Sequence, residues 1–583
     1  MSPAAANLPF GGLVRVLLAV LLVLGLVPPA SAAPAPAFDD PLTSARTQWW
    51  RDAKFGMFVH FGPYSWWGGE YRRPDGTVCQ DAEWIKLRCD IPWPEYEAAA
   101  RKFNPTEFDA DEIARLAQDA GQKYVVITSK HHDGFAMWPT RTMTWNLHDH
   151  SGFQRDILAE LKRASERRGL RFGLYYSIND WHDPGVTGDA SAYKQRMREQ
   201  LRELVTTYHP ATLWFDGQGQ PWWSLRDGDE LQQYLRSLDP KLIINDRVAK
   251  SRFVDGDHET PERHQNIPQA PLDAVAWESC ITTSNRWGWA RYDTAFKPSS
   301  QLTRFLTDIT GRGGNMLLNV GPDDLGRIPA GAQQSLRGVG DWLRANGKAV
   351  YGTSMTGLVA DPGWGAVTRR GDKLYLSVYD WASSLHLSTK APFDVLAARV
   401  LGSSQRVRWQ ASGDGIDVLP SGQPTNSTAS VVELTIRTPQ PVHGTGSGLS
   451  GEYFDGDRLV VRRTDPTLDF PWRLTTPAAP GVPLDDFSVR WTGSLQASYT
   501  GPHTLMTVSD DTVKVWLGDQ VVIDNTKPHG PRVDKAVVNL EAGKKYPIKV
   551  EYADLTGEAY LKLLWSNPYE SQRVVPSSAL SPV

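Results

Sequence analysis

The chain has 583 residues, a formal net charge of −4, and 22% charged against 40% hydrophobic residues. Its length is enough for roughly three or four domains, and its composition is that of an ordinary globular protein. The charge excludes an extended basic surface for nucleic acid or anionic lipid. Only three cysteines occur, which excludes a fold built on disulfides. Cys79 and Cys89 could pair in an oxidising compartment, leaving Cys280 as a buried lone thiol.

The N-terminal segment, residues 1–33, predicts a signal peptide. Arg15 precedes an apolar run over residues 16–27, and Ala30-Ser31-Ala32 follows as a small-residue cleavage site. The run is too short for a confident membrane span. We therefore expect a secreted, extracellular protein with no membrane span in the mature chain.

Short apolar strands and amphipathic helices alternate over residues 40–353. Asp109 and Glu112 form a capping box at the start of a helix that ends at Gly121. Alternation of this kind indicates either a (β/α) TIM-like barrel or a doubly wound sheet. We favour the barrel, because no glycine-rich loop follows a strand as a nucleotide-binding sheet would require. We expect strands at 54–60, 123–129, 171–176, 211–215, 242–244, 274–277 and 314–320, and further helices at 194–208, 230–238, 300–310 and 332–345.

Beyond residue 353 the helical period disappears and short strands take over. We expect a β-sandwich over 354–443, a Gly/Ser linker over 444–450, and an independent all-β module over 451–583. The chain is thus predicted to be multidomain.

Polar groups follow the expected strands, and Asp216 is the most informative of them. It ends the apolar run 211–215 and precedes Gly217. An isolated Asp-Gly pair is more often a turn, but the other strands end in a similar way. In a parallel barrel these strand ends form one face, which holds the active site. The other groups are His60, His131, His132, Asn179-Asp180, Asn245-Asp246-Arg247 and Glu278.

Three histidines on this face suggest either metal binding or recognition of hydroxyl groups. The adjacent His131 and His132 would point to opposite sides of a strand and form a poor chelating pair. Neutral imidazoles that donate and accept hydrogen bonds to a polyol fit better.

Glycoside hydrolysis with retention needs a second carboxylate about 5 Å from the nucleophile. Glu259, Glu262 and Glu278 all follow Asp216 in the chain, on the appropriate side. Spacing alone does not choose between them.

Several motifs resemble the α-L-fucosidases of glycoside hydrolase family 29. They are Lys54-Phe55-Gly56-Met57-Phe58-Val59-His60-Phe61-Gly62, Glu83-Trp84-Ile85, Lys130-His131-His132-Asp133-Gly134-Phe135, Asp180-Trp181-His182, Leu213-Trp214-Phe215-Asp216-Gly217, Asn245-Asp246-Arg247, Trp277-Glu278-Ser279-Cys280 and Asn315-Met316-Leu317-Leu318-Asn319-Val320-Gly321-Pro322. Phe61 stands where the family usually has tryptophan. The resemblance covers residues 48–354 and implies a retaining mechanism, without metal or organic cofactor, acting on fucosylated oligosaccharides or glycoconjugates.

The resemblance also implies a role for each site residue. Asp216 would be the nucleophile. Glu262 would be the acid/base, because the family has a pocket carboxylate at the Glu after Thr and one further residue; Glu259 and Glu278 remain alternatives. Glu83 and Trp84 would close the pocket, and Trp287 would pack on the fucose methyl group. The full set of implied fucose contacts is His60, Glu83, Trp84, His131, His132, Tyr175, Trp214, Arg247 and Trp287.

The C-terminal module resembles the protective-antigen-type β-barrel of secreted carbohydrate-active proteins. The resemblance rests on the segments 448–454, 489–493, 509–511 and 564–565. In some relatives paired aspartates bind calcium and sugar, which makes Asp510 and Asp511 candidates for calcium. Thr512 stands where glycine is common and weakens that expectation. The module is expected to be either a second carbohydrate contact or an inert spacer.

The favoured function is a secreted retaining exo-glycosidase that hydrolyses terminal α-L-fucosyl linkages by double displacement. Two alternatives stay open: a catalytically weak, lectin-like fucose-binding protein on the same barrel, and a metal-dependent deacetylase or other barrel hydrolase. The candidate acid carboxylates favour the enzyme over the binding protein.

Overall fold

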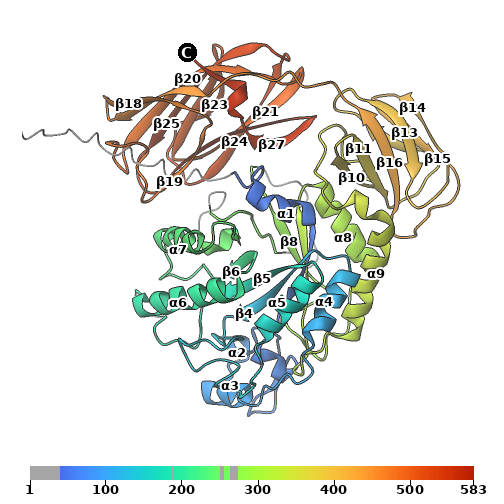
Figure 1. Cartoon of the computed structure of the whole chain (residues 1–583), viewed down its shortest axis with the longest axis vertical. Coiled ribbons are helices and arrows are strands. Elements are labelled where there is room, and N and C mark those ends of the chain that lie inside the picture. Colours follow the sequence, from blue (N-terminus) through green and yellow to red (C-terminus); the bar gives the residue numbers. More distant parts are fainter. Residues whose placement is uncertain (1–39, 187–188, 250–254, 263–273) are drawn as a thin grey trace, which may run out of the picture. The chain divides into compact units, whose positions relative to one another are not determined.

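The computed structural model describes residues 40–186, 189–249, 255–262 and 274–583 (Figure 1). The expected signal peptide, residues 1–33, lies outside the described residues. Within the described ranges, no helix has the length and apolar character needed to cross a membrane.

Seven parallel strands form a curled sheet in the order β7-β6-β5-β4-β1-β9-β8. All seven residues of β4 and all six of β9 are buried, as expected for a parallel sheet covered on both faces. The strands are β1 (Phe55–Val59), β4 (Tyr124–Lys130), β5 (Arg171–Ser177), β6 (Thr212–Asp216), β7 (Ile243–Ile244), β8 (Glu278–Thr282) and β9 (Asn315–Val320).

Residues 257–262 pair with both edge strands of this sheet. His258 forms a parallel bridge with Asn245, just after β7, and Glu262 forms one with Cys280 of β8. The amide of Glu278 donates to the carbonyl of Glu259 at 2.8 Å. The edges β7 and β8 are therefore linked through this segment.

Helices alternate with the strands, and side-chain caps fix where several of them begin. The Asp109 carboxylate accepts a hydrogen bond from the Glu112 amide at 3.0 Å, which confirms Asp109 as the N-cap of α4. Ser224 and Asp227 form a reciprocal capping box on α7. The helices are α1 (Ala45–Ala53), α2 (Ile85–Arg88), α3 (Trp93–Ala100), α4 (Ala110–Asp119), α5 (Ile157–Arg167), α6 (Ser191–Tyr208), α7 (Leu225–Leu238), α8 (Ser299–Gly311) and α9 (Ala330–Asn346).

The apolar stripes of these helices pack into one core with the sheet. Ile113 and Leu116 of α4 and Leu158 and Leu161 of α5 are at most 2% exposed and belong to the same buried cluster. Each such side chain contributes about 1.5–3 kcal/mol to folding. The core holds the strands in register, so the residues that follow each strand are placed by its packing.

One expected strand was misplaced. The apolar run 274–277 was predicted as a strand followed by Glu278, but β8 begins at Glu278. Ala274 has a left-handed backbone with φ of 64°, which interrupts an extended chain. Glu278 therefore lies at the beginning of its strand, away from the carboxyl ends that carry the other candidates.

Two small antiparallel sheets make up the region that follows the parallel sheet in the chain. Leu374 and Leu434 from the first sheet and Leu387 and Val418 from the second share one buried cluster, so the sheets pack as a sandwich. The first sheet has the order β10 (Gly365–Arg370), β11 (Lys373–Val378), β16 (Ser430–Arg437), β13 (Asp394–Val400), and the second has β12 (Leu385–Ser388), β15 (Gly415–Pro420), β14 (Val407–Ser412).

The C-terminal module is all-β and has its own core. Trp491 from one sheet and Trp565 from the other are fully buried in one cluster. The larger sheet has the order β18 (Arg458–Asp465), β17 (Leu449–Asp455), β20 (Phe487–Gln496), β25 (Lys545–Asp554), β22 (Thr512–Leu517), β23 (Gln520–Asn525), with β28 (Leu580–Pro582) beside β20. The smaller one has β19 (Asp469–Arg473), β26 (Ala559–Asn567), β21 (Gly501–Asp510), β24 (Arg532–Leu540), with β27 (Glu570–Val574) beside β26.

The expected linker 444–450 overlaps the first strand of this module by two residues, since β17 begins at Leu449. The amides of Gly446 and Gly448 donate to the carbonyls of Ser578 and Leu580 at 2.9 and 3.0 Å. These glycines are thus hydrogen-bonded to the last residues of the module.

Candidate active site

Asp216 is the last residue of β6 and lies among the strand ends, as predicted. Its Oδ2 accepts a hydrogen bond from the Tyr175 hydroxyl at 3.0 Å and lies 3.4 Å from His132 Nε2. Its Oδ1 accepts from Arg247 Nη1 at 2.9 Å and from the Gly217 amide at 2.8 Å. Gly217 has φ of +78°, and a Cβ there would lie 2.9 Å from the Asn179 backbone nitrogen. Glycine is therefore required for this turn.

The contacts of Asp216 keep its carboxyl ionised. Burial by itself would raise the pKa, but the Arg247 guanidinium and the His132 ring outweigh burial and hold the pKa well below its usual range. The side chain is 20% exposed, so a substrate can reach it. A carboxylate that is charged, fixed in orientation and accessible is what a nucleophile requires.

Glu262 lies beside Asp216, and Arg247 joins the two. The same Arg247 Nη1 contacts Asp216 Oδ1 and Glu262 Oε1. Two oxygens that share one nitrogen at hydrogen-bonding distance lie within about 6 Å of each other. Glu262 is 34% exposed, more than Asp216, so it is the carboxylate more open to solvent.

Glu259 does not share this position. It bridges Trp277 and lines a small cavity of about 30 Å³ together with Asp257, His258 and Ala276. Glu259 and Glu262 are three residues apart on an extended segment, so they point to opposite sides. Of these two, only Glu262 makes a described contact with Arg247.

Glu278 is buried at the start of β8 among neutral groups. Its Oε1 accepts hydrogen bonds from Trp50 Nε1 at 3.1 Å and from the Tyr124 hydroxyl. Burial raises its pKa to about 7 despite these bonds. The side chain is 2% exposed, which leaves no room for a leaving group beside it. The expectation that Glu278 follows a strand was wrong, because β8 begins at Glu278 and the other candidates lie where strands end.

The three histidines cluster as predicted, although one detail was wrong. His131 and His132 do not point to opposite sides, because β4 ends at Lys130 and the chain turns there. Their ring centroids are 4.4 Å apart, and His131 lies 5.8 Å from His60. Burial lowers the pKa of His60 to about 4 and that of His131 well below its usual value. Both rings are therefore neutral, as hydroxyl recognition requires.

Aromatic side chains pack around these polar groups. Tyr175 and Trp214 stack at 5.6 Å with an interplanar angle of 20°, and Arg247 lies over Trp214 at 4.9 Å. Trp287 lies 5.1 Å from His60 and 6.2 Å from Phe58. Faces of this kind pack against the CH groups of a sugar ring.

Glu83 and Trp84 approach from a separate segment. Glu83 is buried and accepts a hydrogen bond from the Gly288 amide at 3.0 Å, next to Trp287. Trp84 lies 5.1 Å from His132 and 5.1 Å from Trp181. This segment lies between Cys79 and Cys89.

Cys79 and Cys89 form a disulfide with Cα atoms 5.6 Å apart. Cys79 is in β3 (Val78–Gln80), which pairs with β2 (Glu70–Arg72), and Cys89 caps α2. The bond closes the loop that carries Glu83 and Trp84. Cys280 is free and buried, as expected.

Three supporting residues received no role from the sequence. Asn319 Oδ1 lies 2.6 Å from His60 Nδ1, and Ser177 Oγ lies 2.6 Å from His132 Nδ1. Thr260 holds Arg247, accepting from its Nε at 3.0 Å. The polar position of Asn319 inside the apolar β9 was a usable signal. The contacts of Ser177 and Thr260 depend on tertiary packing and left no sequence signal.

Over the described ranges, no group of three or more His, Cys, Asp or Glu side chains is arranged to hold a metal ion. In the C-terminal module, burial together with Asp511, Glu558 and Asp554 raises the pKa of Asp510 to about 8. Calcium binding by Asp510 and Asp511 stays a prediction.

Comparison with known proteins shows which families the chain matches. Residues 31–348 match the family model described as Alpha-L-fucosidase, and residues 445–579 match the PA14 domain. An alpha-L-fucosidase of Branchiostoma floridae is 31% identical over 410 residues, covering 66% of this chain and 91% of that protein.

Solved structures give the same result. Alpha-L-fucosidase isoenzyme 1 from Paenibacillus thiaminolyticus is 31% identical, with a TM-score of 0.60, covering 68% of this chain and 99% of that one. A trapped covalent intermediate of a GH29 alpha-L-fucosidase from Bacteroides thetaiotaomicron is 27% identical, with a TM-score of 0.64, covering 68% and 97%. This chain therefore belongs to the α-L-fucosidase family and carries a PA14 domain at its C-terminal end.

Proposed function

We propose that this protein is a secreted exo-α-L-fucosidase that removes terminal α-L-fucosyl residues from oligosaccharides or glycoconjugates with retention of configuration. The observation that carries the proposal is the contact of Arg247 Nη1 with both Asp216 and Glu262. It supports a pair of carboxylates that lie close together, as the separation of about 5–5.5 Å in retaining glycosidases requires. One of the two is charged and fixed, and the other is more open to solvent.

In the first step the Asp216 carboxylate attacks the anomeric carbon while Glu262 protonates the glycosidic oxygen, so the aglycone leaves as an alcohol. The product is a fucosyl ester on Asp216. In the second step Glu262 takes a proton from water, which attacks the anomeric carbon and releases the Asp216 carboxylate. Two displacements at one carbon retain its configuration.

The groups around Asp216 are suited to a small polyol. His60 and His131 are neutral and able to donate or accept. Tyr175 and Trp214 supply apolar faces, and Trp287 the wall against which a methyl group would pack. Glu83 and Trp84 would complete the pocket from the disulfide-closed loop. The groups that surround Asp216 on several sides support binding of a terminal sugar.

We also infer a closed (β/α) barrel of eight strand positions as the catalytic domain. Seven are regular strands, and the bridges of residues 257–262 to Asn245 and Cys280 support this segment as the eighth. The same proposal includes the domain limits 40–353, 354–443 and 451–583. It also includes export directed by residues 1–33.

The acid/base assignment is tested by replacing each candidate glutamate with alanine. Glu262→Ala should lose activity on a fucosylated oligosaccharide far more than on a nitrophenyl fucoside, because an activated phenolate leaves without protonation. Azide should restore its turnover of the nitrophenyl fucoside. Glu259→Ala is the matched control, because Glu259 lies three residues away and points away from Arg247. It should show neither the selective loss on the oligosaccharide nor the azide effect. An equal loss on both substrates with no azide effect would exclude Glu262.

A further inference from the structure

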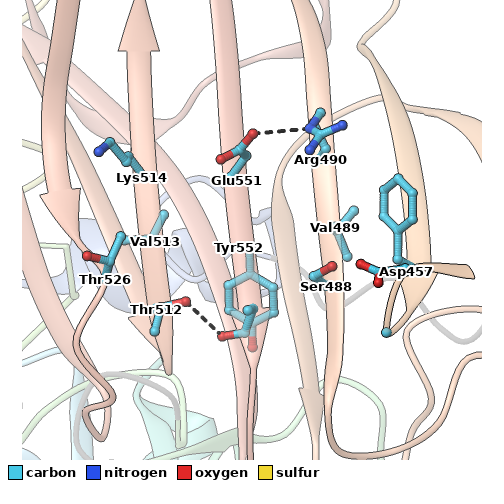
Figure 2. Close-up of a pocket in the computed structure, with 13 residues that line it drawn as sticks. Asp457, Ser488, Val489, Arg490, Thr512, Val513, Lys514, Thr526, Glu551 and Tyr552 are labelled. Carbon is cyan, nitrogen blue, oxygen red and sulfur yellow. Dashed lines mark hydrogen bonds and ion pairs between the residues drawn. The ribbon is translucent and has the colours of Figure 1, made fainter. Parts of the chain in front are cut away.

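A pocket of about 340 Å³ lies on the outer face of the larger sheet of the C-terminal module (Figure 2). Its volume falls in the range of small-molecule sites, about 300–1,000 Å³. It shares no residue with the active site or with the Asp510–Asp511 pair.

The floor of the pocket is a cross-strand row of small side chains. Ser488 of β20 lies opposite Ala553 of β25, and Ala553 lies opposite Thr512 of β22. At one end of the row Phe454 of β17 lies opposite Ser488. Residues opposite each other share a face of the sheet, so three small residues beside a large aromatic leave a depression.

The next row is charged and alternates in sign across five strands. Arg490 lies opposite both Glu452 and Glu551, and Lys514 lies opposite both Glu551 and Asp524. Arg490 pairs with Glu551 at 3.1 Å, and Lys514 pairs with Asp524 at 2.7 Å. Figure 2 shows Arg490, Glu551 and Lys514 side by side at one edge of the pocket.

These charges cancel within the pocket. Its lining holds two cations, Arg490 and Lys514, and two anions, Glu551 and Asp457. A charged ligand would find no excess of opposite charge there. An uncharged polar ligand would meet donors and acceptors, of which Arg490, Glu551 and Lys514 are held by ion pairs. The pocket is therefore matched to a neutral ligand with many hydroxyl groups.

The backbone of the floor is not available to a ligand. Strand β20 is paired with β17 and β25, and β25 with β20 and β22. A peptide cannot add to the sheet here as a further strand, which removes the main source of affinity in that binding mode. Recognition must come from side chains: the hydroxyls of Ser488 and Thr526, the charged row, and the ring of Phe454. Hydroxyl-matching polar groups beside an aromatic ring are what a sugar unit binds.

We propose that this pocket is a non-catalytic binding site for an uncharged saccharide. The site is independent of fucose cleavage and of calcium. It would hold the enzyme on a glycan through units other than the fucose in the active site.

The test uses the full-length protein and a panel of fucose-free oligosaccharides, neutral and sulfated, so that the active site contributes no signal. Wild type should bind at least one neutral oligosaccharide saturably, and its sulfated form no more tightly. Ser488→Trp fills the depression and should weaken binding by about tenfold or more. Thr492→Trp is the matched control: it lies four residues along the same face of β20, outside the pocket, and should bind as wild type.

Both variants should keep wild-type turnover of a nitrophenyl fucoside, which separates this proposal from the proposed catalytic function. If Ser488→Trp does not fold, Arg490→Ala replaces it, and the loss of the Arg490–Glu551 pair should also weaken binding. No binding of any neutral oligosaccharide by wild type, equal binding by the pocket variant and the control, or tighter binding of the sulfated forms would each overturn the proposal.

Discussion

Asp216 and Glu278, two carboxylates on strands of the same parallel sheet, differ in pKa, and the comparison shows what causes the difference. Asp216 ends β6 and is held ionised, whereas burial raises the pKa of Glu278, at the start of β8, to about 7. Asp216 contacts the Arg247 cation at 2.9 Å. Glu278 accepts bonds from neutral Trp50 and Tyr124. The partner, rather than burial, therefore sets the charge state.

The histidine beside each carboxylate contributes to the difference between Asp216 and Glu278. His132 adds to the attraction that keeps Asp216 ionised. His258 Nε2 lies 3.9 Å from Glu278, but burial lowers the His258 pKa to about 4, so this ring is neutral and supplies no counter-charge. The carboxyl end of β6 thus holds an ionised carboxylate, whereas the start of β8 holds Glu278, whose pKa burial raises to about 7.

Of the variants considered, replacement of Asp216, the ionised carboxylate, should have the largest effect on kcat. Asp216→Ala should lower kcat by about 10⁴-fold or more, because the covalent route is lost. Azide fits the space left by the carboxylate and should give a glycosyl azide of inverted configuration. If the variant unfolds like wild type and retains more than a few per cent of wild-type activity, Asp216 is not the nucleophile.

Removing the cation should make Asp216 behave more like Glu278. Arg247→Met should lower kcat/KM by about 10²–10³-fold. The Asp216 pKa is depressed in the folded protein, so losing Arg247 raises it, and the acidic limb of the kcat/KM profile should move to higher pH by about 1–3 units. Arg399→Met, which removes an arginine paired with Glu433 in the sandwich, should leave the profile unchanged. A profile that does not move in Arg247→Met would contradict the assigned role.

Glu278 should respond in stability rather than in activity. Its folded pKa of about 7 lies above the unfolded value, so the folded state binds the extra proton and wild-type stability falls as pH rises between about 4.5 and 7, by roughly 3 kcal/mol. Glu278→Gln keeps an acceptor oxygen without a proton to lose. Thermal unfolding across this range should lose that slope, while activity at pH 6 stays within about threefold of wild type.

Exposed Glu166→Gln is the control for this measurement and should keep the wild-type slope. A Glu278→Gln variant whose unfolding shows the same pH dependence as wild type would mean that Glu278 is ionised in the folded protein.

The smallest effect concerns the loop over the site. Opening the Cys79–Cys89 bond by a double Ser substitution should cost about 2 kcal/mol of stability. It should raise KM a few-fold with kcat nearly kept, because Glu83 and Trp84 lie on the loop that it closes. Cys280→Ser, at the free thiol, should not change KM. A large fall in kcat with KM unchanged would place the loop in the chemistry itself.

Much of this arrangement was predictable from the sequence because it depends on local pattern. The apolar run before Asp216 and the Asp109 cap define elements whose ends lie where expected. The position of Glu278 was misjudged because 274–277 is as apolar as a strand, and the left-handed Ala274 backbone leaves no trace in composition.

The choice between Glu259 and Glu262 depends on which side of the segment 257–262 faces Arg247, which only tertiary pairing decides. The contacts of Ser177 with His132 and of Thr260 with Arg247 are likewise long-range. Sequence pattern thus located the face and the candidate nucleophile, and three-dimensional packing supplied the partners that set the charge of Asp216.

The most direct test of the central claim, that Asp216 forms the covalent intermediate, is peptide mapping by mass spectrometry after reaction with 2-fluoro-fucosyl fluoride. Fluorine at C2 slows both displacements, while the fluoride leaving group keeps the first fast enough for the ester to accumulate. We expect one fucosyl label per chain, on the peptide that contains Asp216. Glu262→Ala should still be labelled, since fluoride leaves without an acid. A label on Glu262 or any other residue, or no label in protein that still hydrolyses fucosides, would contradict the claim.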